Sequence, residues 1–359
     1  MKIVTVVGAR PQFVKAAAVS RVIRKKHTEV LIHTGQHYDN NMSDVFFEEL
    51  HIPKPDINLG VGSGTHAKQT AEMMVGIEEV LLQESPDYIM VYGDTNSTLA
   101  GAIAASKIHI PIIHVEAGLR SFNMYMPEEL NRILTDRIST LLLCPTDVAV
   151  DNLKKEGVVK GVYNVGDVMC DAVLYYSKIL DQHPASYYFS HLCPFSDSVD
   201  VIDEWYLATI HRAENTDSID KVKEVLDAFE QLDAKVIFPV HPRTKRIVKE
   251  LISNRNYNNI LFVEPMGYLD MLFFTREAKK VVTDSGGLQK ETYILDTPCV
   301  TVRDQTEWVE TLIGNHNILA KPNAKDIVDK VMNTVIDHSK KKMYYGMGNA
   351  AEKICDLIR

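Results

Sequence analysis

Carboxylic acids follow two apolar runs in the N-terminal half of the chain. Asp94 lies two residues beyond the run 88–92, and Glu116 comes directly after the run 111–115. Glu128 falls in the first turn of a helix expected to begin at the preceding proline. Carboxylates that gather in a partly dry site can donate and accept protons as general acids and bases. The structural alternatives are a helix cap for Asp94 and a favourable interaction with the helix dipole for Glu128.

Two histidines end apolar runs in the C-terminal half. His211 ends the run 205–211, and His241 follows the run 234–240. An imidazole can act as an acid, a base or a cation near neutral pH, although a structural role for each histidine stays open. The chain contains no H-E-x-x-H or comparable ligand spacing, so the sequence predicts no metal site.

The segment VVTDSGGLQKE (281–291) is the strongest local signal for phosphate binding. A strand is expected to lead into Ser285, after which Gly286 and Gly287 open a helix. Two glycines let ligand atoms approach the backbone, and a helix N-terminus offers N–H donors and a positive partial charge. Glu291, one turn further along, is placed to accept hydrogen bonds from ribose hydroxyls. A tight turn without a ligand is the structural alternative.

The segment GARPQFVK (8–15) follows the first apolar run. Of a dinucleotide fingerprint it holds only Gly8, whereas Arg10 and Phe13 occupy positions where the backbone would have to approach a pyrophosphate. A nicotinamide dinucleotide is therefore not expected. Arg10 and Lys15 lie near the start of a helix, where they can meet a phosphate together with helix N–H groups. Solvated cations on a helix are the structural alternative.

These residues stand on a chain that alternates short apolar runs with helical patterns. Such alternation is typical of βαβ units and a parallel sheet, and in such sheets ligands bind outside the carboxyl ends of the strands. The runs expected to form strands are 3–7, 30–34, 88–92, 111–115, 140–144, 162–166, 205–211, 234–240, 259–263, 280–283, 298–302 and 317–320.

The alternation pauses in the middle of the chain. It stops near residue 170 and restarts at 205, after a stretch with Pro, Ser and Asp (183–204) that we interpret as a loop or connector. The sequence thus predicts two α/β domains with a cleft between them, residues 1–170 and 171–343. A helix within 344–359 is expected to join the first domain.

Composition excludes several classes of protein. The 359 residues carry 39 Lys plus Arg against 48 Asp plus Glu, a net charge of −9, which argues against nucleic-acid binding. The five cysteines are scattered without a C-x-x-C pair, as in a protein with reduced thiols. The first apolar run is too short for a signal peptide, and no later run reaches about 18 residues. We therefore expect a cytoplasmic protein with no membrane partner.

Taken together, these motifs resemble those of the non-hydrolysing UDP-N-acetylglucosamine 2-epimerases. The resemblance extends over nearly the whole chain and is carried by GARPQFVK, GQHYDNNM, YGDTNSTLAG, HVEAGLRS, MPEELNRILTD, HRAEN, HPRT, TDSGGLQKE and RDQTEW. It implies a fold of the glycosyltransferase B type, with two Rossmann-like domains facing a cleft and the nucleotide held mainly by the C-terminal one. It also implies a homodimer and no metal or redox cofactor.

The resemblance assigns roles to individual residues. The active-site carboxylates match Asp94, Glu116 and Glu128, and the active-site histidine matches His211. Contacts to uracil match the backbone at Met266, and contacts to the UDP phosphates and ribose match Arg10, Lys15, Ser285, Gly286, Gly287 and Glu291.

The reaction that the resemblance implies inverts C2 of the sugar, converting UDP-N-acetylglucosamine to UDP-N-acetylmannosamine. Anti elimination of UDP gives a 2-acetamidoglucal, and UDP then adds back with protonation on the opposite face. Such chemistry requires at least two carboxylates, for which we expect Asp94 and Glu116 with assistance from Glu128. It also requires stabilisation of the departing diphosphate, which Arg10, His211 and the turn at Ser285 can supply.

Departures from the family pattern leave the substrate open. Trp308 stands where many bacterial members have arginine, and Gln12 with Phe13 replaces a Glu-plus-aliphatic pair. Both features resemble the branch that epimerises UDP-2,3-diacetamido-2,3-dideoxyglucuronate. Many bacterial members bind a second UDP-sugar as an activator at positions that here read QHYD (36–39) and Lys68, so the sequence does not predict that activation. A hydrolysing epimerase, an inverting glycosyltransferase and a nucleotide-sugar sensor also stay open as functions.

Overall fold

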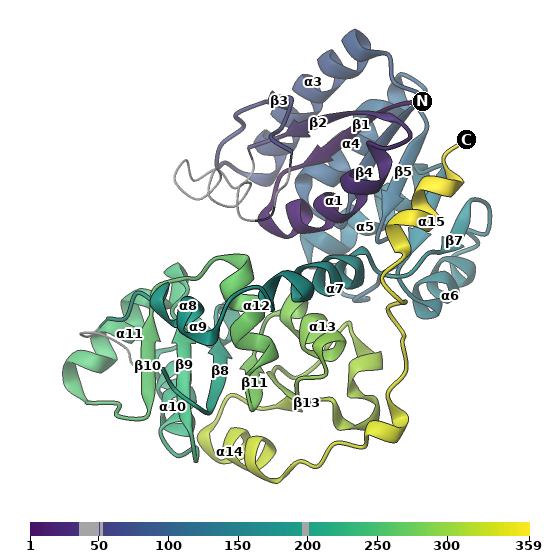
Figure 1. The fold of residues 1–359 in the computed structure, drawn as a ribbon. Helices are drawn as coiled ribbons and strands as arrows, with labels where there is room; N and C mark the ends of the chain where they lie inside the picture. The colour runs from purple at the N-terminus through teal and green to yellow at the C-terminus, as the bar shows by residue number, and fades with distance from the viewer. Residues whose placement is uncertain (36–49, 51–52, 196–200) are drawn as a thin grey trace. The chain divides into compact units, whose positions relative to one another are not determined.

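The chain forms two compact units. A computed structural model describes residues 1–35, 50, 53–195 and 201–359. One unit combines Met1–Leu174 with Met343–Arg359, and the other is Tyr175–Lys342 (Figure 1). The division thus falls after Leu174, whereas the sequence places it after residue 170.

The described part of the first unit is built on a seven-stranded parallel sheet. Its strands are β1 (Lys2–Val7), β2 (Thr28–His33), β3 (Ile57–Asn58), β4 (Tyr88–Tyr92), β5 (Ile112–Val115), β6 (Leu141–Cys144) and β7 (Val162–Asn164). They lie in the order β3-β2-β1-β4-β5-β6-β7. Because helices cover both faces of such a sheet, its strands read as nearly continuous apolar runs. Accordingly, all residues of β5 are buried.

Helices follow most of these strands. They are α1 (Arg10–Ile23), α3 (His66–Glu84), α4 (Asn96–Lys107), α5 (Pro127–Ile138), α6 (Asp147–Lys155) and α7 (Val168–Leu180). The sequence of α4, NSTLAGAIAASK, holds mostly small residues, which lets the helix approach the sheet closely. A Cβ at Gly101 would lie only 3.1 Å from Val91.

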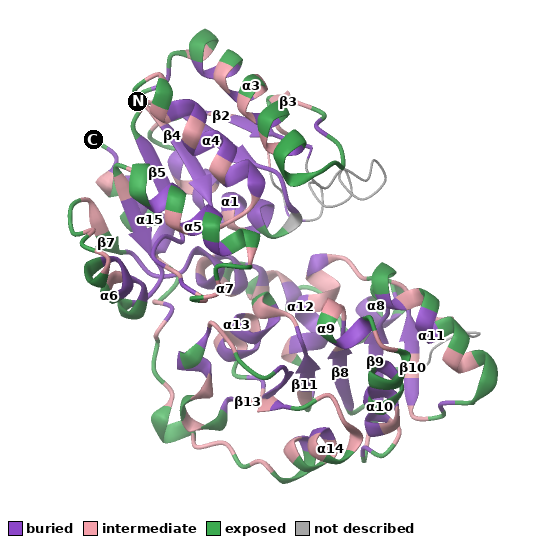
Figure 2. Ribbon diagram, turned by 180° about the vertical axis from the view of Figure 1, so that it is seen from behind, coloured by how far each residue is buried: buried purple, intermediate pink, exposed green. Residues whose placement is uncertain are grey.

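Helix α5 has an inverted pattern of burial. It buries polar side chains that include Glu129, Arg132 and Asp136, and it exposes Leu130 and Leu134. Figure 2 shows that α5 has both buried and exposed parts. A soluble helix normally buries its apolar face, so this inversion indicates that the buried side of α5 serves a polar site.

The described part of the second unit repeats the design with a six-stranded parallel sheet in the order β10-β9-β8-β11-β12-β13. The strands are β8 (Trp205–Thr209), β9 (Lys235–Pro239), β10 (Ile260–Val263), β11 (Lys280–Thr283), β12 (Cys299–Val302) and β13 (Asn317–Ala320). The helices are α8 (Ala185–Ser190), α9 (Ala213–Thr216), α10 (Ile219–Phe229), α11 (Pro242–Asn254), α12 (Tyr268–Arg276), α13 (Gly286–Leu295) and α14 (Ala324–Asn333).

The last helix, α15 (Ala350–Leu357), belongs to the first unit and packs on α1. The carboxylate of Asp171 accepts hydrogen bonds from the backbone N–H groups of Ala350 and Ala351, at 3.0 and 2.8 Å. An acidic side chain is favourable at a helix N-terminus. This cap attaches the end of the chain to α7.

Each apolar run expected to form a strand overlaps an observed one. The structure adds β3, whose two residues are too few to show a pattern. The interpretation of 183–204 as a loop is wrong for Ala185–Ser190, which form α8. Tyr188 and Phe189 are buried there, and the Tyr188 ring stacks on Phe273 with centroids 4.0 Å apart. Aromatic burial, rather than hydrophobic periodicity, therefore stabilises α8.

No helix in the described ranges is long and apolar enough to cross a membrane.

Candidate active site

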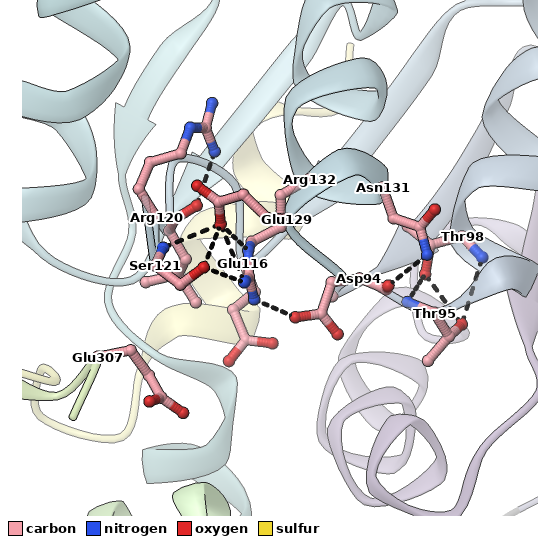
Figure 3. Close-up of polar contacts among 12 residues, drawn as sticks. Asp94, Thr95, Thr98, Glu116, Arg120, Ser121, Glu129, Asn131, Arg132 and Glu307 are labelled. Carbon is pink, nitrogen blue, oxygen red and sulfur yellow. Dashed lines mark hydrogen bonds and ion pairs between the residues drawn. The ribbon is translucent and has the colours of Figure 1, made fainter. Parts of the chain in front are cut away.

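Asp94 and Glu116 lie close together at the carboxyl ends of the neighbouring strands β4 and β5. Gly93, between β4 and Asp94, has a φ of 63°. A Cβ at Gly93 would lie 3.3 Å from the Glu116 Oε2 atom and 3.7 Å from the Lys15 Nζ atom. Both the left-handed conformation and the close neighbours therefore favour glycine at this point. Figure 3 shows the polar contacts around the two carboxylates.

The Asp94 carboxylate pairs with the guanidinium of Arg132 on α5 (Figure 3). Thr95, not Asp94, caps α4 through its side chain, which accepts from the Thr98 N–H. The capping alternative for Asp94 is therefore wrong. Burial raises the pKa of Asp94, the charges of Arg132 and Lys15 act to lower it, and neighbouring carboxylates add to the rise. Its side chain keeps 33% exposure.

Glu116 is 7% exposed and forms an ion pair with Lys15 of α1. Its φ is +74°, in the left-handed region that non-glycine residues rarely adopt. Strained backbone of this kind is concentrated at functional sites, where the surrounding structure enforces it. The sequence assigns Lys15 only to phosphate binding, so its contact with Glu116 is an addition from the structure.

Glu128 and Glu129 are adjacent in sequence but have opposite surroundings. Glu128 is exposed, while Glu129 is 1% exposed and accepts from the Ser121 N–H, the Ser121 hydroxyl and the Phe122 N–H at 2.9–3.0 Å. Burial acts to raise the pKa of Glu129, but these hydrogen bonds and the charge of Arg132 lower it overall. Glu129 therefore fixes the 116–129 connection, and its carboxylate also pairs with Arg132.

Gln12 connects the turn after β1 to the end of β4. Its side-chain oxygen accepts from the Gly8 and Ala9 N–H groups at 2.8 and 3.0 Å. Its side-chain nitrogen donates to the Tyr92 carbonyl at 2.6 Å and to the Thr98 hydroxyl at 3.0 Å. A glutamate in this pose would place a carboxylate oxygen against a carbonyl, so the amide is matched to its surroundings.

In the second unit, Asp284 holds the segment that carries His211. The fully buried Asp284 carboxylate accepts from the backbone N–H groups of His211 and Arg212 and from the Asn215 amide, at 2.9–3.1 Å. The His211 Nδ1 atom is 3.3 Å from the same carboxylate. Burial lowers the pKa of His211, and the charge of Arg212 adds to this while Asp284 opposes it. The free imidazole is therefore mostly neutral at pH 7.

The second strand-end histidine has a structural role. His241 is the N-cap of α11, where its Nδ1 atom accepts from the Arg243 N–H at 3.2 Å. Its ring centroid lies 5.2 Å from that of His211. The structural alternative thus accounts for His241.

The start of α13 distinguishes its two glycines. Ser285 is the N-cap, and its hydroxyl accepts from the Leu288 N–H at 3.5 Å. A Cβ at Gly286 would lie 2.6 Å from a carboxylate oxygen of Glu307, whereas a Cβ at Gly287 would meet nothing in the described chain closer than 4.0 Å. Neither glycine has a positive φ. Nothing in the described protein therefore requires glycine at Gly287.

The sequence predicts further nucleotide contacts at Glu291, Met266 and Arg10. Burial raises the pKa of Glu291 to about 7, although Lys290 and a hydrogen bond with Tyr268 act to lower it. Met266 is partly buried in the connection between β10 and α12. The side chain of Arg10 lies outside the described atoms, as does the segment 36–39.

A possible metal cluster lies elsewhere. Among the described residues, ligand atoms of Asp296, His316 and His338 lie within 4.8 Å of one another. Asp296 follows the last residue of α13, at the end opposite Ser285. The Lys341 ammonium lies 2.7 Å from the Asp296 carboxylate and already neutralises it. We assign no metal to this cluster.

Comparison with known proteins identifies the family. The model of the family described as UDP-N-acetylglucosamine 2-epimerase matches residues 21–359. The chain belongs to this family. A UDP-N-acetylglucosamine 2-epimerase homolog of Methanococcus maripaludis is 48% identical over 100% of this chain and 99% of its own length. A UDP-2,3-diacetamido-2,3-dideoxy-D-glucuronate 2-epimerase of Pseudomonas aeruginosa is 45% identical over the same shares.

Solved structures confirm the fold class. The crystal structure of the Methanocaldococcus jannaschii UDP-GlcNAc 2-epimerase in complex with UDP-GlcNAc and UDP matches with a TM-score of 0.88 and 40% identity, and covers 100% of this chain and 99% of that one. The predicted membership of the epimerase family is thus confirmed, and the protein is an enzyme of the epimerase class with two parallel α/β sheets.

Two residues of the candidate site, Arg132 and Asp284, do not stand out in the sequence. Arg132 lies within the block MPEELNRILTD, but a single arginine on a helix does not stand out from a solvated cation. Asp284 reads only as part of a turn. Each residue is recognised only by a long-range contact. Arg132 pairs with Asp94, and Asp284 accepts hydrogen bonds from the segment that carries His211.

Proposed function

We propose that this epimerase inverts C2 of UDP-N-acetylglucosamine and gives UDP-N-acetylmannosamine. The proposal is supported most directly by the carboxylates of Asp94 and Glu116, which end adjacent strands and each pair with a different cation. Two separately held carboxylates suit a reaction that removes a proton from one face of a carbon and returns it to the other.

The proposed reaction proceeds by anti elimination. The proton on C2 is only weakly acidic, because no carbonyl group is attached to that carbon. One carboxylate takes it while the bond from C1 to the UDP oxygen breaks, the electron pair leaves with UDP, and a C1–C2 double bond forms. UDP then adds back to C1 of the 2-acetamidoglucal as the second carboxylic acid protonates C2 on the opposite face. Glu128 assists these transfers.

UDP is held in this proposal mainly by the second unit. The first backbone N–H groups of α13 bind phosphate at Ser285, Gly286 and Gly287, and the space beside Gly287 supports this role. Glu291 accepts from the ribose, and the backbone at Met266 contacts uracil. Arg10 and Lys15 of the first unit also contact the diphosphate.

His211 stabilises the departing diphosphate. Because its Nδ1 atom faces Asp284, its Nε2 atom is the one available to the substrate. A bound diphosphate favours the protonated form of a nearby imidazole, so we expect the pKa of His211 to rise when UDP binds.

A second substrate is favoured by a specific observation. The relative that acts, by its name, on UDP-2,3-diacetamido-2,3-dideoxy-D-glucuronate is 45% identical, compared with 41% for the Methanocaldococcus jannaschii UDP-N-acetylglucosamine 2-epimerase. Trp308, Gln12 and Phe13 also resemble that branch. The Trp308 ring supports the Lys290 ammonium at 4.0 Å from its centroid, so an arginine here would change the charge of the site.

A proton NMR time course in D2O with each UDP-sugar tests the proposal. We expect UDP-N-acetylglucosamine to form its C2 epimer. The H2 signals of the substrate and of the epimer should disappear, because deuterium replaces the proton, and free UDP should not accumulate. Conversion of the diacetamidoglucuronate alone would select the second substrate, and stoichiometric UDP with free sugar would indicate a hydrolysing enzyme. Retention of H2 during epimerisation would contradict the elimination mechanism.

A homodimer is part of the proposed function. Leu130, Leu134 and Ile138 form an exposed apolar stripe on α5, at 37–49% exposure. Residues four apart lie on one face of a helix, and such a stripe suits a second copy of the chain. Light scattering should give a dimeric mass, and L134E should give a monomer. A monomeric mass for the unaltered protein would contradict the dimer.

A further inference from the structure

His114 is a fully buried residue of β5, two positions before Glu116. Its Nδ1 atom lies 2.7 Å from the Asp136 carboxylate, and its Nε2 atom lies 2.8 Å from the Gly93 carbonyl oxygen. A carbonyl oxygen can only accept a hydrogen bond. Asp136 is held ionised by the Arg120 guanidinium at 2.8 Å, so it also accepts. Both ring nitrogens of His114 therefore face hydrogen-bond acceptors, one on a side chain of α5 and one on the backbone after β4.

Asp136 holds the chain on both sides of Glu116. One carboxylate oxygen accepts from His114, and the other accepts from the Gly118 N–H at 3.2 Å. The stretch from His114 to Gly118 is thus attached at two points to one side chain of α5. This attachment accounts for the left-handed backbone of Glu116, a conformation that persists only where surrounding contacts enforce it.

The same ring also fixes the peptide before Asp94. The Gly93 carbonyl accepts from His114 Nε2, and the Gly93 N–H donates to the Val115 carbonyl at 3.0 Å. Gly93 is therefore bound through both its polar groups to β5. His114 consequently connects the peptide before Asp94 to the carboxylate of Asp136. That carboxylate in turn holds the backbone on both sides of Glu116.

We propose that His114, together with Asp136, is a positioning residue that sets the spacing of the Asp94 and Glu116 carboxylates. The proposal rests on the proposed function, in which these two carboxylates exchange the C2 proton. His114 itself touches no substrate, because it is fully buried beneath the strand ends.

Two substitutions separate the two hydrogen bonds. An asparagine amide reaches about as far as Nδ1, so H114N keeps the contact with Asp136 and loses the one with Gly93. A glutamine amide reaches about as far as Nε2, so H114Q keeps the contact with Gly93. A small misplacement of reacting groups can cost about 100-fold in rate. We expect kcat of H114N to fall about 100-fold, with KM and the Kd for UDP nearly unchanged, and H114Q to recover much of that loss.

A matched control is E29Q. Glu29 is also a buried charged residue of the first sheet, but it lies on β2 near the amino ends of the strands and pairs with Arg24. We expect E29Q to lower Tm at least as much as H114N while kcat stays unchanged. If H114N does not fold, D136N replaces it, with an expected loss in kcat of about tenfold and an unchanged Kd for UDP.

The outcomes distinguish this inference from the proposed function. Three results would overturn the positioning role. The first is full kcat in H114N, and the second is an equal loss of kcat in H114N and H114Q. The third is a loss of kcat in E29Q in proportion to its change in Tm. D94N is measured in parallel. An active D94N would refute the proposed function, whereas an inactive D94N beside a fully active H114N would refute only the present inference.

Discussion

The carboxyl ends of the two sheets each present an aspartate after a buried strand, but the two aspartates have different surroundings. The Asp94 carboxylate is 33% exposed and pairs with the side chain of Arg132. The Asp284 carboxylate is fully buried and binds backbone N–H groups of the segment 211–212 and the Asn215 amide. The position of an acid in the fold therefore does not decide its role. Its exposure and the nature of its hydrogen-bond donors do.

The comparison extends to the way each unit arranges charge. The first unit pairs acidic side chains with basic ones, Glu116 with Lys15 and Asp94 with Arg132. The second unit presents a helix N-terminus beside glycines at the start of α13. Paired side chains suit proton transfer, and backbone N–H groups suit the binding of a diphosphate.

The largest expected effect is loss of turnover in D94N and E116Q. Each substitution keeps the shape of the side chain but removes its ability to exchange a proton, which typically contributes a factor of about 10²–10⁴. We expect kcat to fall about 1,000-fold while UDP binds normally by calorimetry. E128Q is the comparison for an exposed carboxylate, and its kcat should fall less than that of D94N or E116Q. Normal turnover in both D94N and E116Q would contradict the role given to the first sheet.

The second effect concerns stability rather than chemistry. D284A removes the acceptor of two backbone N–H groups and the Asn215 amide, and unsatisfied buried donors cost about 1–3 kcal/mol each. We expect the free energy of unfolding to fall by about 3 kcal/mol in urea denaturation. In D94A, Arg132 keeps its ion pair with Glu129, so the fall should be smaller. Equal losses would remove the distinction between the two aspartates.

A third test compares the two glycines of α13. In G287A the added methyl group would meet nothing in the described protein closer than the Ser285 hydroxyl at 4.0 Å, so Tm should not fall. It would occupy the space next to the backbone, and we expect UDP to bind about tenfold more weakly, equivalent to about 1.4 kcal/mol. In G286A the methyl group would displace the end of the flexible Glu307 side chain, so Tm should fall slightly. Unchanged UDP affinity in G287A would argue against phosphate binding there.

The smallest effect is a pH dependence in the second unit. Glu291 has a pKa raised from 4.5 to about 7, so the folded state binds more protons than the unfolded state between these values. Stability should therefore decrease as the pH rises from about 4.5 to 7. Urea denaturation of the wild type and of E291Q at about pH 4.5 and about pH 7 measures this change in the free energy of unfolding. If E291Q keeps the full pH dependence, its source lies in another group.

The sequence predicted more of the fold than of the site. Apolar runs located the strands because burial on both faces of a parallel sheet leaves a continuous apolar signal. The strand β3 was missed since two residues carry no period, and α8 was missed since it depends on aromatic contacts with Phe273. The placement of Asp94 and Glu116 at strand ends followed from the same alternation.

The sequence by itself determined which acidic, basic and imidazole side chains the chain carries and in what order. It also determined the edge of the sheet on which they lie. Tertiary structure alone decided their partners. Lys15 and Glu116 are 101 residues apart, and neighbouring residues such as Glu128 and Glu129 differ in exposure because the helix turns by about 100° per residue. Hydrogen bonding and burial act through space, so only the folded chain distinguishes a carboxylate that we propose to exchange protons from one that holds a loop.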